Sequence, residues 1–348
     1  MLRITKHALL ALVGAGLVWG AGAVQAEGYN RAGTAAAPEL LIPVGARDMA
    51  LGGASIASTS GIEAIHWNPA GLARAESDAN AMFSTMSYLA DMNVNYLAVS
   101  ARFPRLGSLA LSLKALDAGK IDVTTERQPD GTGGTFSPTF FTLGLTYARE
   151  LTDRIALGTT VHYISNTMDR VDASSVAFSA GLQYLNLGNI DGLDLGVAVK
   201  HIGKRMRYEG PGLTNRGSLP DLRRPPAFYN VEASSADLPS VFEIGVGYRY
   251  PTGGLGQLNL SSVFQHHNYN YDQYRAGAEY VLNDFLALRG GFDYAADAAD
   301  DTHLFGTSYG LGLAFDLGGK LEDVRLDYAY TAAEHFDALN TFTFQVGF

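Results

Sequence analysis

The sequence contains no cysteine, which excludes a disulfide framework and any cysteine-based metal site. After residue 26, no stretch reaches the length of about 18 continuous apolar residues that a helical membrane span needs, so no second helical span is expected. Basic residues are also scarce, with 25 Lys and Arg against 35 Asp and Glu and a formal net charge of −10. Nucleic acid is therefore not an expected partner, because neutralising phosphates requires clustered Lys and Arg.

The first 26 residues have the organisation of a secretory signal peptide. Arg3 and Lys6 form a basic start, and residues 8–24 form an apolar region. Residues 24–26 then end in the small residues that a signal peptidase accepts. The mature chain is expected to begin at Glu27. The alternative is a retained membrane anchor, for which the apolar region stands at the short limit.

The composition combines abundant apolar residues with a low mean hydropathy. Hydrophobic residues make up 47% of the chain, yet the mean hydropathy is only +0.02. A membrane β-barrel can be this polar because only every second strand residue faces lipid. The 40 Gly, 18 Tyr and 17 Phe suit such a barrel, although composition alone also allows a secreted β-sandwich.

From residue 79 to the end, apolar and polar residues alternate with period two, the pattern of strands with two different faces. In residues 240–251, for example, Phe242 and Ile244 share one face, while Glu243 and Gly245 share the other. Fourteen such segments are predicted, at residues 79–89, 92–103, 107–118, 138–149, 154–167, 173–187, 193–204, 239–250, 256–267, 271–282, 285–295, 303–317, 321–332 and 338–348.

The connections between these segments largely alternate between short and long. An even number of strands, with short periplasmic turns and longer outer loops, is typical of bacterial outer-membrane barrels. The strands are long for a sandwich, and fourteen are too many for one. The predicted fold class is therefore all-β, a transmembrane antiparallel β-barrel of about 14 strands over residues 79–348, located in the outer membrane of a Gram-negative-type bacterium.

Charged residues of both signs fall on the face of these strands that would point into the lumen. They could pair with a polar plug or line a water-filled passage, and the sequence leaves both interpretations open. The lumen-facing charges are Lys200, Arg249, Arg275, Glu279, Arg289, Asp293, Arg325 and Asp327.

The last segment places Phe342, Phe344, Val346 and Phe348 on one face. An alternating apolar strand that ends in an aromatic residue resembles the terminal signature read by the barrel-insertion machinery. Phe348 is therefore a candidate insertion signal, and the alternative is an ordinary amphipathic last strand.

Residues 27–78 do not alternate and are rich in Gly and Ala. Residues 62–66 are expected to form a short helix that ends before Pro69. Because side chains of the wall cannot fill the lumen of a fourteen-stranded barrel, this segment is predicted to be a plug or hatch inside it. The alternative is a periplasmic extension with no gating role.

Two stretches of this segment carry a family resemblance. Residues 39–54 contain Gly-Ala-Arg and Gly-Gly-Ala elements, and residues 63–72 end in Trp-Asn-Pro-Ala-Gly-Leu. Together they resemble the N-terminal signature of the PorV/PorQ family, a branch of the FadL-like outer-membrane barrels. The motif residues are Gly45, Arg47, Gly52, Gly53, Trp67, Asn68, Pro69, Ala70 and Gly71.

The resemblance implies a fourteen-stranded barrel closed by a hatch that contains the Asn-Pro-Ala element. FadL-like transporters pass hydrophobic molecules inward, whereas PorV-like proteins serve the type IX secretion system and receive secreted protein cargo. The leading hypothesis is admission of small hydrophobic molecules past the plug. A secretion-system docking barrel and a plain structural barrel are the alternatives, and the apparent lack of elaborate outer loops beyond residues 205–238 argues against docking.

No motif for catalysis, a metal or a cofactor is found. The sequence has no Gly-rich phosphate loop and no His-Glu-x-x-His element. His266 and His267 are adjacent on a strand and point to opposite faces, and no nucleophile is tied to them or to Asp272. Asp297, Asp300 and Asp301 crowd one outer loop, where they could hold a divalent cation or simply be solvated. The expected partners are outer-membrane lipid and lipopolysaccharide, the insertion machinery, and either a hydrophobic ligand or secretion-system proteins.

Overall fold

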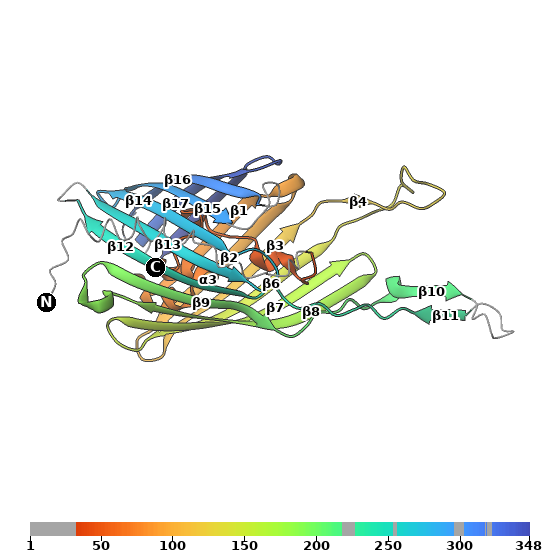
Figure 1. Cartoon of the computed structure of the whole chain (residues 1–348), viewed down its shortest axis with the longest axis horizontal. Helices are drawn as coiled ribbons and strands as arrows, with labels where there is room; N and C mark the ends of the chain where they lie inside the picture. Colours follow the sequence, from red (N-terminus) through yellow and green to blue (C-terminus); the bar gives the residue numbers. More distant parts are fainter. Residues whose placement is uncertain (1–32, 218–226, 253–255, 296–302, 317, 319–321) are drawn as a thin grey trace.

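The computed structural model describes residues 33–217, 227–252, 256–295, 303–316, 318 and 322–348. Within these residues, fourteen antiparallel strands close into a barrel (Figure 1), which confirms the predicted fold class and strand number. The barrel strands are β1 (Ala79–Ser87), β2 (Asn93–Phe103), β3 (Gly107–Asp117), β6 (Thr139–Glu150), β7 (Ile155–Met168), β8 (Val171–Tyr184), β9 (Leu193–Gly203), β12 (Val241–Pro251), β13 (Gln257–His267), β14 (Gln273–Leu282), β15 (Leu286–Ala295), β16 (Phe305–Phe315), β17 (Glu322–Ala333) and β18 (Leu339–Gly347).

The first and last strands pair with each other to close the wall. Asn80 lies opposite Gly347, and Ser87 lies opposite Asn340. The backbone N–H of Phe348 donates to the carbonyl of Ala79 at 2.8 Å, so the pairing continues to the final residue. Each other barrel strand pairs with its neighbours in chain order, and no crossover is needed.

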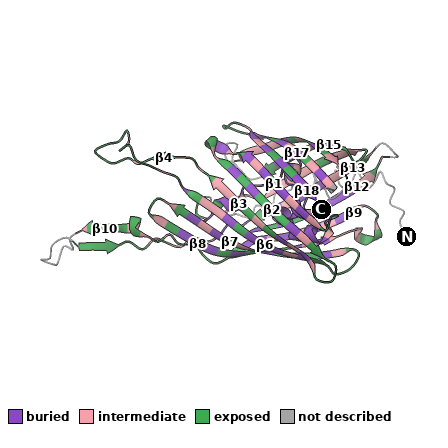
Figure 2. Ribbon diagram, turned by 180° about the vertical axis from the view of Figure 1, so that it is seen from behind, coloured by how far each residue is buried: buried purple, intermediate pink, exposed green. Residues whose placement is uncertain are grey.

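The two faces of the wall differ as the alternation predicts. On β12, Val241 and Glu243 are 2% and 1% exposed, whereas Phe242 and Ile244 are 40% and 41% exposed. The same bands of buried and exposed residues cross the other strands (Figure 2). The exposed outer face is apolar because it meets lipid, and the chain is accordingly an outer-membrane barrel.

The predicted alternation fails at two β-bulges. Uninterrupted period-two alternation predicts Phe305 on the lipid face with Tyr309, and Val324 on it with Leu326. In the structure, Phe305 packs against the inner core and Val324 is only 3% exposed. The register between β16 and β17 shifts between Phe305 and Ser308, and that between β17 and β18 shifts between Glu322 and Arg325. An extra residue in one strand reverses the face of the residues beyond it, which corrects both assignments.

Two long connections contain short hairpins that the sequence did not predict. The first consists of β4 (Ile121–Asp122) and β5 (Thr135–Phe136). The second consists of β10 (Thr214–Gly217) and β11 (Ala227–Asn230), preceded by η6 (Pro211–Leu213). Both project beyond the barrel at the same end, away from the C-terminus (Figure 1). Because these are the long connections, this end is assigned to the outer face of the membrane.

The first described residues, 33–78, lie inside the barrel, and we call them the inner segment. None of its helices, nor any other described helix, is long and apolar enough to cross a membrane. One end of the segment packs on β15 to β18 and the other on β6 to β8. Its helical turns are η1 (Pro38–Leu41), α2 (Ala46–Ala50), η2 (Gly61–Glu63), α3 (Ala64–Trp67) and η3 (Pro69–Arg74), and the connections add η4 (Leu89–Asp91) and η5 (Leu187–Asn189).

Two predictions fall on parts of the chain outside the described residues. These are the signal peptide at residues 1–26 and the outer-loop carboxylates Asp297, Asp300 and Asp301.

Candidate functional site

The Asn-Pro element fixes the inner segment to the wall. Asn68 is fully buried, and its side-chain amide donates to the carbonyls of Ile56 at 2.8 Å and Leu182 at 3.1 Å. The amide oxygen accepts from the Ala70 N–H at 3.2 Å, which caps η3. Pro69 holds Asn68 extended and begins η3, as its fixed φ allows. One side chain therefore connects two parts of the inner segment to β8.

Glycines on the inner face of the wall let the inner segment approach it directly. A Cβ added at Gly158 would lie 2.3 Å from the carbonyl carbon of Pro69, and one at Gly181 would lie 1.9 Å from the Asn68 side chain. We call these positions the wall glycines because a methyl group at any of them would overlap the inner segment. They are Gly158, Gly181, Gly196, Gly277, Gly291 and Gly310.

The motif glycines of the inner segment have a different function, which is conformational. Gly45 precedes α2 with φ of 86°, and Gly52 and Gly53 follow it with φ of 64° and 74°. Other residues rarely adopt these angles. Gly53 also lies under the Trp67 ring, where a Cβ would approach to 2.7 Å. Gly71 is equally crowded, since a Cβ there would lie 2.3 Å from the Thr59 carbonyl oxygen.

Arg47 of α2 connects the inner segment to an ion-pair network on the wall. Its guanidinium makes two hydrogen bonds of 3.1 Å with Glu279 and lies 3.7 Å from Glu63. Glu279 also accepts from Arg289 at 2.7 Å, and Arg289 pairs with Asp327. Bidentate arginine–carboxylate geometry of this kind sets orientation as well as affinity. The network therefore fixes the position of α2 against β14, β15 and β17.

A second network lies on the neighbouring part of the wall. Arg275 pairs with Asp293 at 3.1 Å and approaches Glu243 at 3.7 Å, and Glu243 pairs with Lys200 at 2.7 Å. The Lys200 ammonium lies 5.5 Å above the Trp67 ring, a cation–π contact with the inner segment.

The remaining two predicted lumen charges lie in separate pairs. Arg249 pairs with Asp194 at 3.2 Å, and Arg325 pairs with Asp323 at 2.6 Å. All eight predicted lumen charges thus lie in ion pairs. Sequence reasoning did not select the partners Glu243, Asp194 and Glu63, although the alternation placed Glu243 on the inner face.

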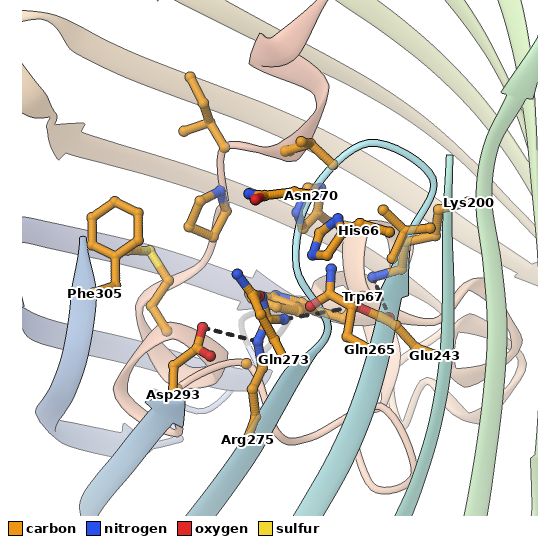
Figure 3. A pocket seen from close by; sticks show the side chains of 18 of the residues that line it. His66, Trp67, Lys200, Glu243, Gln265, Asn270, Gln273, Arg275, Asp293 and Phe305 are labelled. Atoms are coloured by element: carbon orange, nitrogen blue, oxygen red, sulfur yellow. Dashed lines mark hydrogen bonds and ion pairs between the residues drawn. The ribbon is translucent and has the colours of Figure 1, made fainter. Parts of the chain in front are cut away.

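A cavity of about 320 Å³ lies between the inner segment and strands β9 and β12 to β18. In Figure 3, Gln265, Gln273 and Arg275 come from adjacent strands and face Trp67 and His66. The apolar part of the lining includes residues of η1, the following Ile42 and Pro43, and Met49, Phe305 and Leu339. Tyr88, Tyr269 and Asn270 from the outer connections also line the cavity. The cavity therefore has an apolar part, formed by the inner segment with Phe305 of β16 and Leu339 of β18, and a polar part, formed by β9 and β12 to β15.

Burial shifts the pKa values of two titratable groups of the inner segment, Glu63 and His66. Burial, together with the neighbouring carboxylates of Asp48 and Asp327, raises the pKa of Glu63 to about 8. Burial, Lys114 and Lys200 lower the pKa of His66 well below its usual range, so the imidazole that lines the cavity is neutral. Within the described residues, no group of His, Asp and Glu is arranged to hold a metal ion.

A family model described as type IX secretion system protein PorV matches residues 25–217, more than half of the chain. The chain belongs to the PorV family. The resemblance inferred from the inner-segment motifs is thereby confirmed. No curated protein sequence matches this PorV-family chain.

Solved structures show that this PorV-family member shares its fold with FadL-like barrels. The toluene transporter TbuX of Ralstonia pickettii has a TM-score of 0.57 and 15% identity, covering 87% of this chain and 98% of that one. A FadL homologue of Pseudomonas aeruginosa has a TM-score of 0.50 and 11% identity, covering 88% of this chain and 98% of the homologue. The toluene transporter TodX of Pseudomonas putida has a TM-score of 0.50 and 12% identity, covering 85% of this chain and 96% of TodX. PorV and FadL-like proteins are secretion, transport or channel proteins rather than enzymes, in line with the expectation from sequence.

Proposed function

We propose that this barrel admits small hydrophobic molecules across the outer membrane past the inner segment. The cavity between the inner segment and the wall carries the proposal. Its apolar lining includes Ile42, Met49 and Phe305, and its volume of about 320 Å³ suits a small molecule. Tyr88 and Tyr269 belong to connections at the outer end, so a molecule from outside would meet this cavity before the rest of the inner segment. The fold likeness to two toluene transporters supports the same class of cargo.

Ser308 offers a test because it lines the cavity from the inner face of β16 and is 3% exposed. We expect Ser308→Leu to reduce the volume of the cavity and, with it, both co-purifying apolar compounds and uptake of labelled toluene into proteoliposomes. Gly290→Leu is the control on the outer face of the neighbouring strand, because a Cβ there meets only the exposed Tyr309 ring at 4.0 Å. Equal uptake by wild type and Ser308→Leu, with neither preparation retaining a ligand, would contradict the proposal.

A second candidate is docking of secreted protein at the outer face, as in the type IX secretion system named by the family model. The two projecting hairpins favour it, since β11 exposes Phe228 at 75% and Tyr229 at 53%. Period-two alternation alone predicts neither hairpin. The test measures protein export in a host that lacks the gene and receives either the wild-type gene or the double variant Phe228→Ser, Tyr229→Ser. If docking is the function, the variant barrel will assemble normally in the membrane but will not restore the export that the wild-type gene restores.

A further inference from the structure

We propose that the cavity selects neutral molecules that carry a hydroxyl or N–H donor on an apolar body. This inference rests on the proposed uptake of small molecules and specifies their chemistry. It is based on polar atoms of the cavity wall that have no partner among the described residues.

Gln265 and His267 lie two positions apart on the inner face of β13 and line the cavity. They are only 5% and 7% exposed. In the part of the chain that the structure describes, the Gln265 Oε1 atom has no hydrogen-bond partner. The ring nitrogens of His267 make no hydrogen bond of good geometry, although the Gln273 side chain lies beside the ring. Buried polar groups are normally satisfied, because leaving one unpaired costs about 1–3 kcal/mol. A bound molecule would supply the missing partners.

The free groups on this wall are mainly acceptors. Asp293 uses Oδ2 to accept from Arg275, while its buried Oδ1 makes no hydrogen bond with a described residue and has His303 at 3.7 Å. Gln265 Oε1 can only accept, and a neutral imidazole offers one acceptor and one donor. A hydroxyl group both donates and accepts, so it complements this set.

The cations of the same wall are already neutralised. Lys200 is held by Glu243 at 2.7 Å. Arg275 is held by Asp293 at 3.1 Å and by Gln273 at 2.7 Å. A carboxylate ligand would find no unpaired cation there and would face the free acceptors of Gln265 and Asp293. This part of the wall therefore disfavours anions, while the apolar part of the lining accepts a hydrocarbon body.

Binding can be measured through the fluorescence of Trp67, because its side chain lines the cavity. The sequence has two tryptophans, and Trp19 lies in the predicted signal peptide, so Trp67 is the single tryptophan of the expected mature chain; Trp19→Phe gives the same result in any chain that retains residues 1–26. The probes are 4-ethylphenol, ethylbenzene and 4-ethylbenzoate, which share one body and differ in the polar group. Free probe is measured by dialysis against the same detergent. Partitioning into micelles then cancels when variants are compared.

We expect 4-ethylphenol to bind about tenfold more tightly than ethylbenzene, as one satisfied buried hydrogen bond would give, and 4-ethylbenzoate to bind most weakly. The double variant Gln265→Met, His267→Phe replaces both polar side chains by apolar ones of similar shape and somewhat larger volume, and it should lose this preference while still binding ethylbenzene. His266→Phe, on the exposed face of the same strand, should change nothing.

The outcomes separate this inference from the proposed function. Equal binding of the phenol and the hydrocarbon, tighter binding of the carboxylate, or an unchanged preference in the double variant would refute the donor selectivity and leave uptake standing. Absence of binding by all three probes would refute both, and would mean that the free polar atoms are met by water alone.

Discussion

At the residue scale, the inner segment contains a buried carboxyl group that the wall does not fully neutralise. Glu63 is 4% exposed, and its Oε1 atom has no hydrogen-bond partner among the described residues. Arg47 lies 3.7 Å from its other oxygen, but that guanidinium makes its two hydrogen bonds with Glu279. The raised pKa of Glu63 is the consequence, because the neutral form needs less solvation than the charged one.

This shift predicts a pH dependence of stability. The folded protein holds the Glu63 proton up to about pH 8, whereas the unfolded chain releases it near pH 4.5. The contribution of Glu63 to the free energy of unfolding is therefore fully present below pH 4.5 and is lost as the pH rises through about 8. We expect Glu63→Gln to match wild type at acid pH and to be more stable by roughly 1–3 kcal/mol above about pH 8. Urea unfolding in lipid vesicles at several pH values measures both curves, and parallel curves would show that Glu63 is ionised when folded.

Individual residues also show where sequence reasoning reached its limit. Period two identified the inner face, so the charges on it could be selected from sequence. It could not show that Glu243 pairs with Lys200, because their strands are joined through a long connection and only the barrel register brings them together. Glu63 gave no signal at all, since the inner segment has no periodicity from which burial could be inferred.

At the element scale, each barrel strand could be located to within about three residues, because one face meets lipid over its whole length. The bulges at Phe305 and Val324 could not be located, since a bulge depends on the register of the partner strand. The wall glycines were visible as small residues on the inner face, but their function could not be read from one strand. It depends on which inner-segment atoms lie opposite.

Gly290 and Gly291 test the fit between wall and inner segment on a single strand. A Cβ at Gly291 would lie 2.2 Å from the backbone N of Gly52, whereas one at Gly290 would meet only the Tyr309 ring at 4.0 Å. Neither glycine has a positive φ, so backbone strain does not separate them. We expect Gly291→Ala to destabilise the protein by about 1–3 kcal/mol through overpacking, and Gly290→Ala to stay within about 0.5 kcal/mol of wild type.

The measurement is urea unfolding of both variants in vesicles, combined with protease digestion of the folded state. Displacement of the inner segment in Gly291→Ala should expose cleavage sites in residues 33–78 that stay protected in Gly290→Ala. Indistinguishable behaviour of the two variants would mean that α2 does not rest on β15 as described.

At the scale of the whole molecule, closure of the barrel depends on one strand pair formed by the two ends of the described wall. β18 joins β1 over its full length, and the backbone of Phe348 still pairs with Ala79. The Phe348 side chain is 50% exposed on the lipid face, much like Phe344 at 44%. The two side chains therefore contribute to the folded state in similar ways, and a difference between them must arise before folding is complete.

This comparison tests Phe348 as an insertion signal. Phe348→Ala and Phe344→Ala keep all backbone hydrogen bonds of β18 and lose comparable contact with lipid, so both should refold in vitro with similar stability. In cells we expect a several-fold lower yield of membrane-inserted barrel for Phe348→Ala than for Phe344→Ala, because the insertion machinery meets the chain terminus and not the finished wall. The shift in gel mobility between boiled and unboiled outer-membrane samples quantifies the inserted fraction. Equal fractions in cells would reduce Phe348 to an ordinary lipid-facing residue, and a loss of refolding in vitro would assign its effect to stability instead.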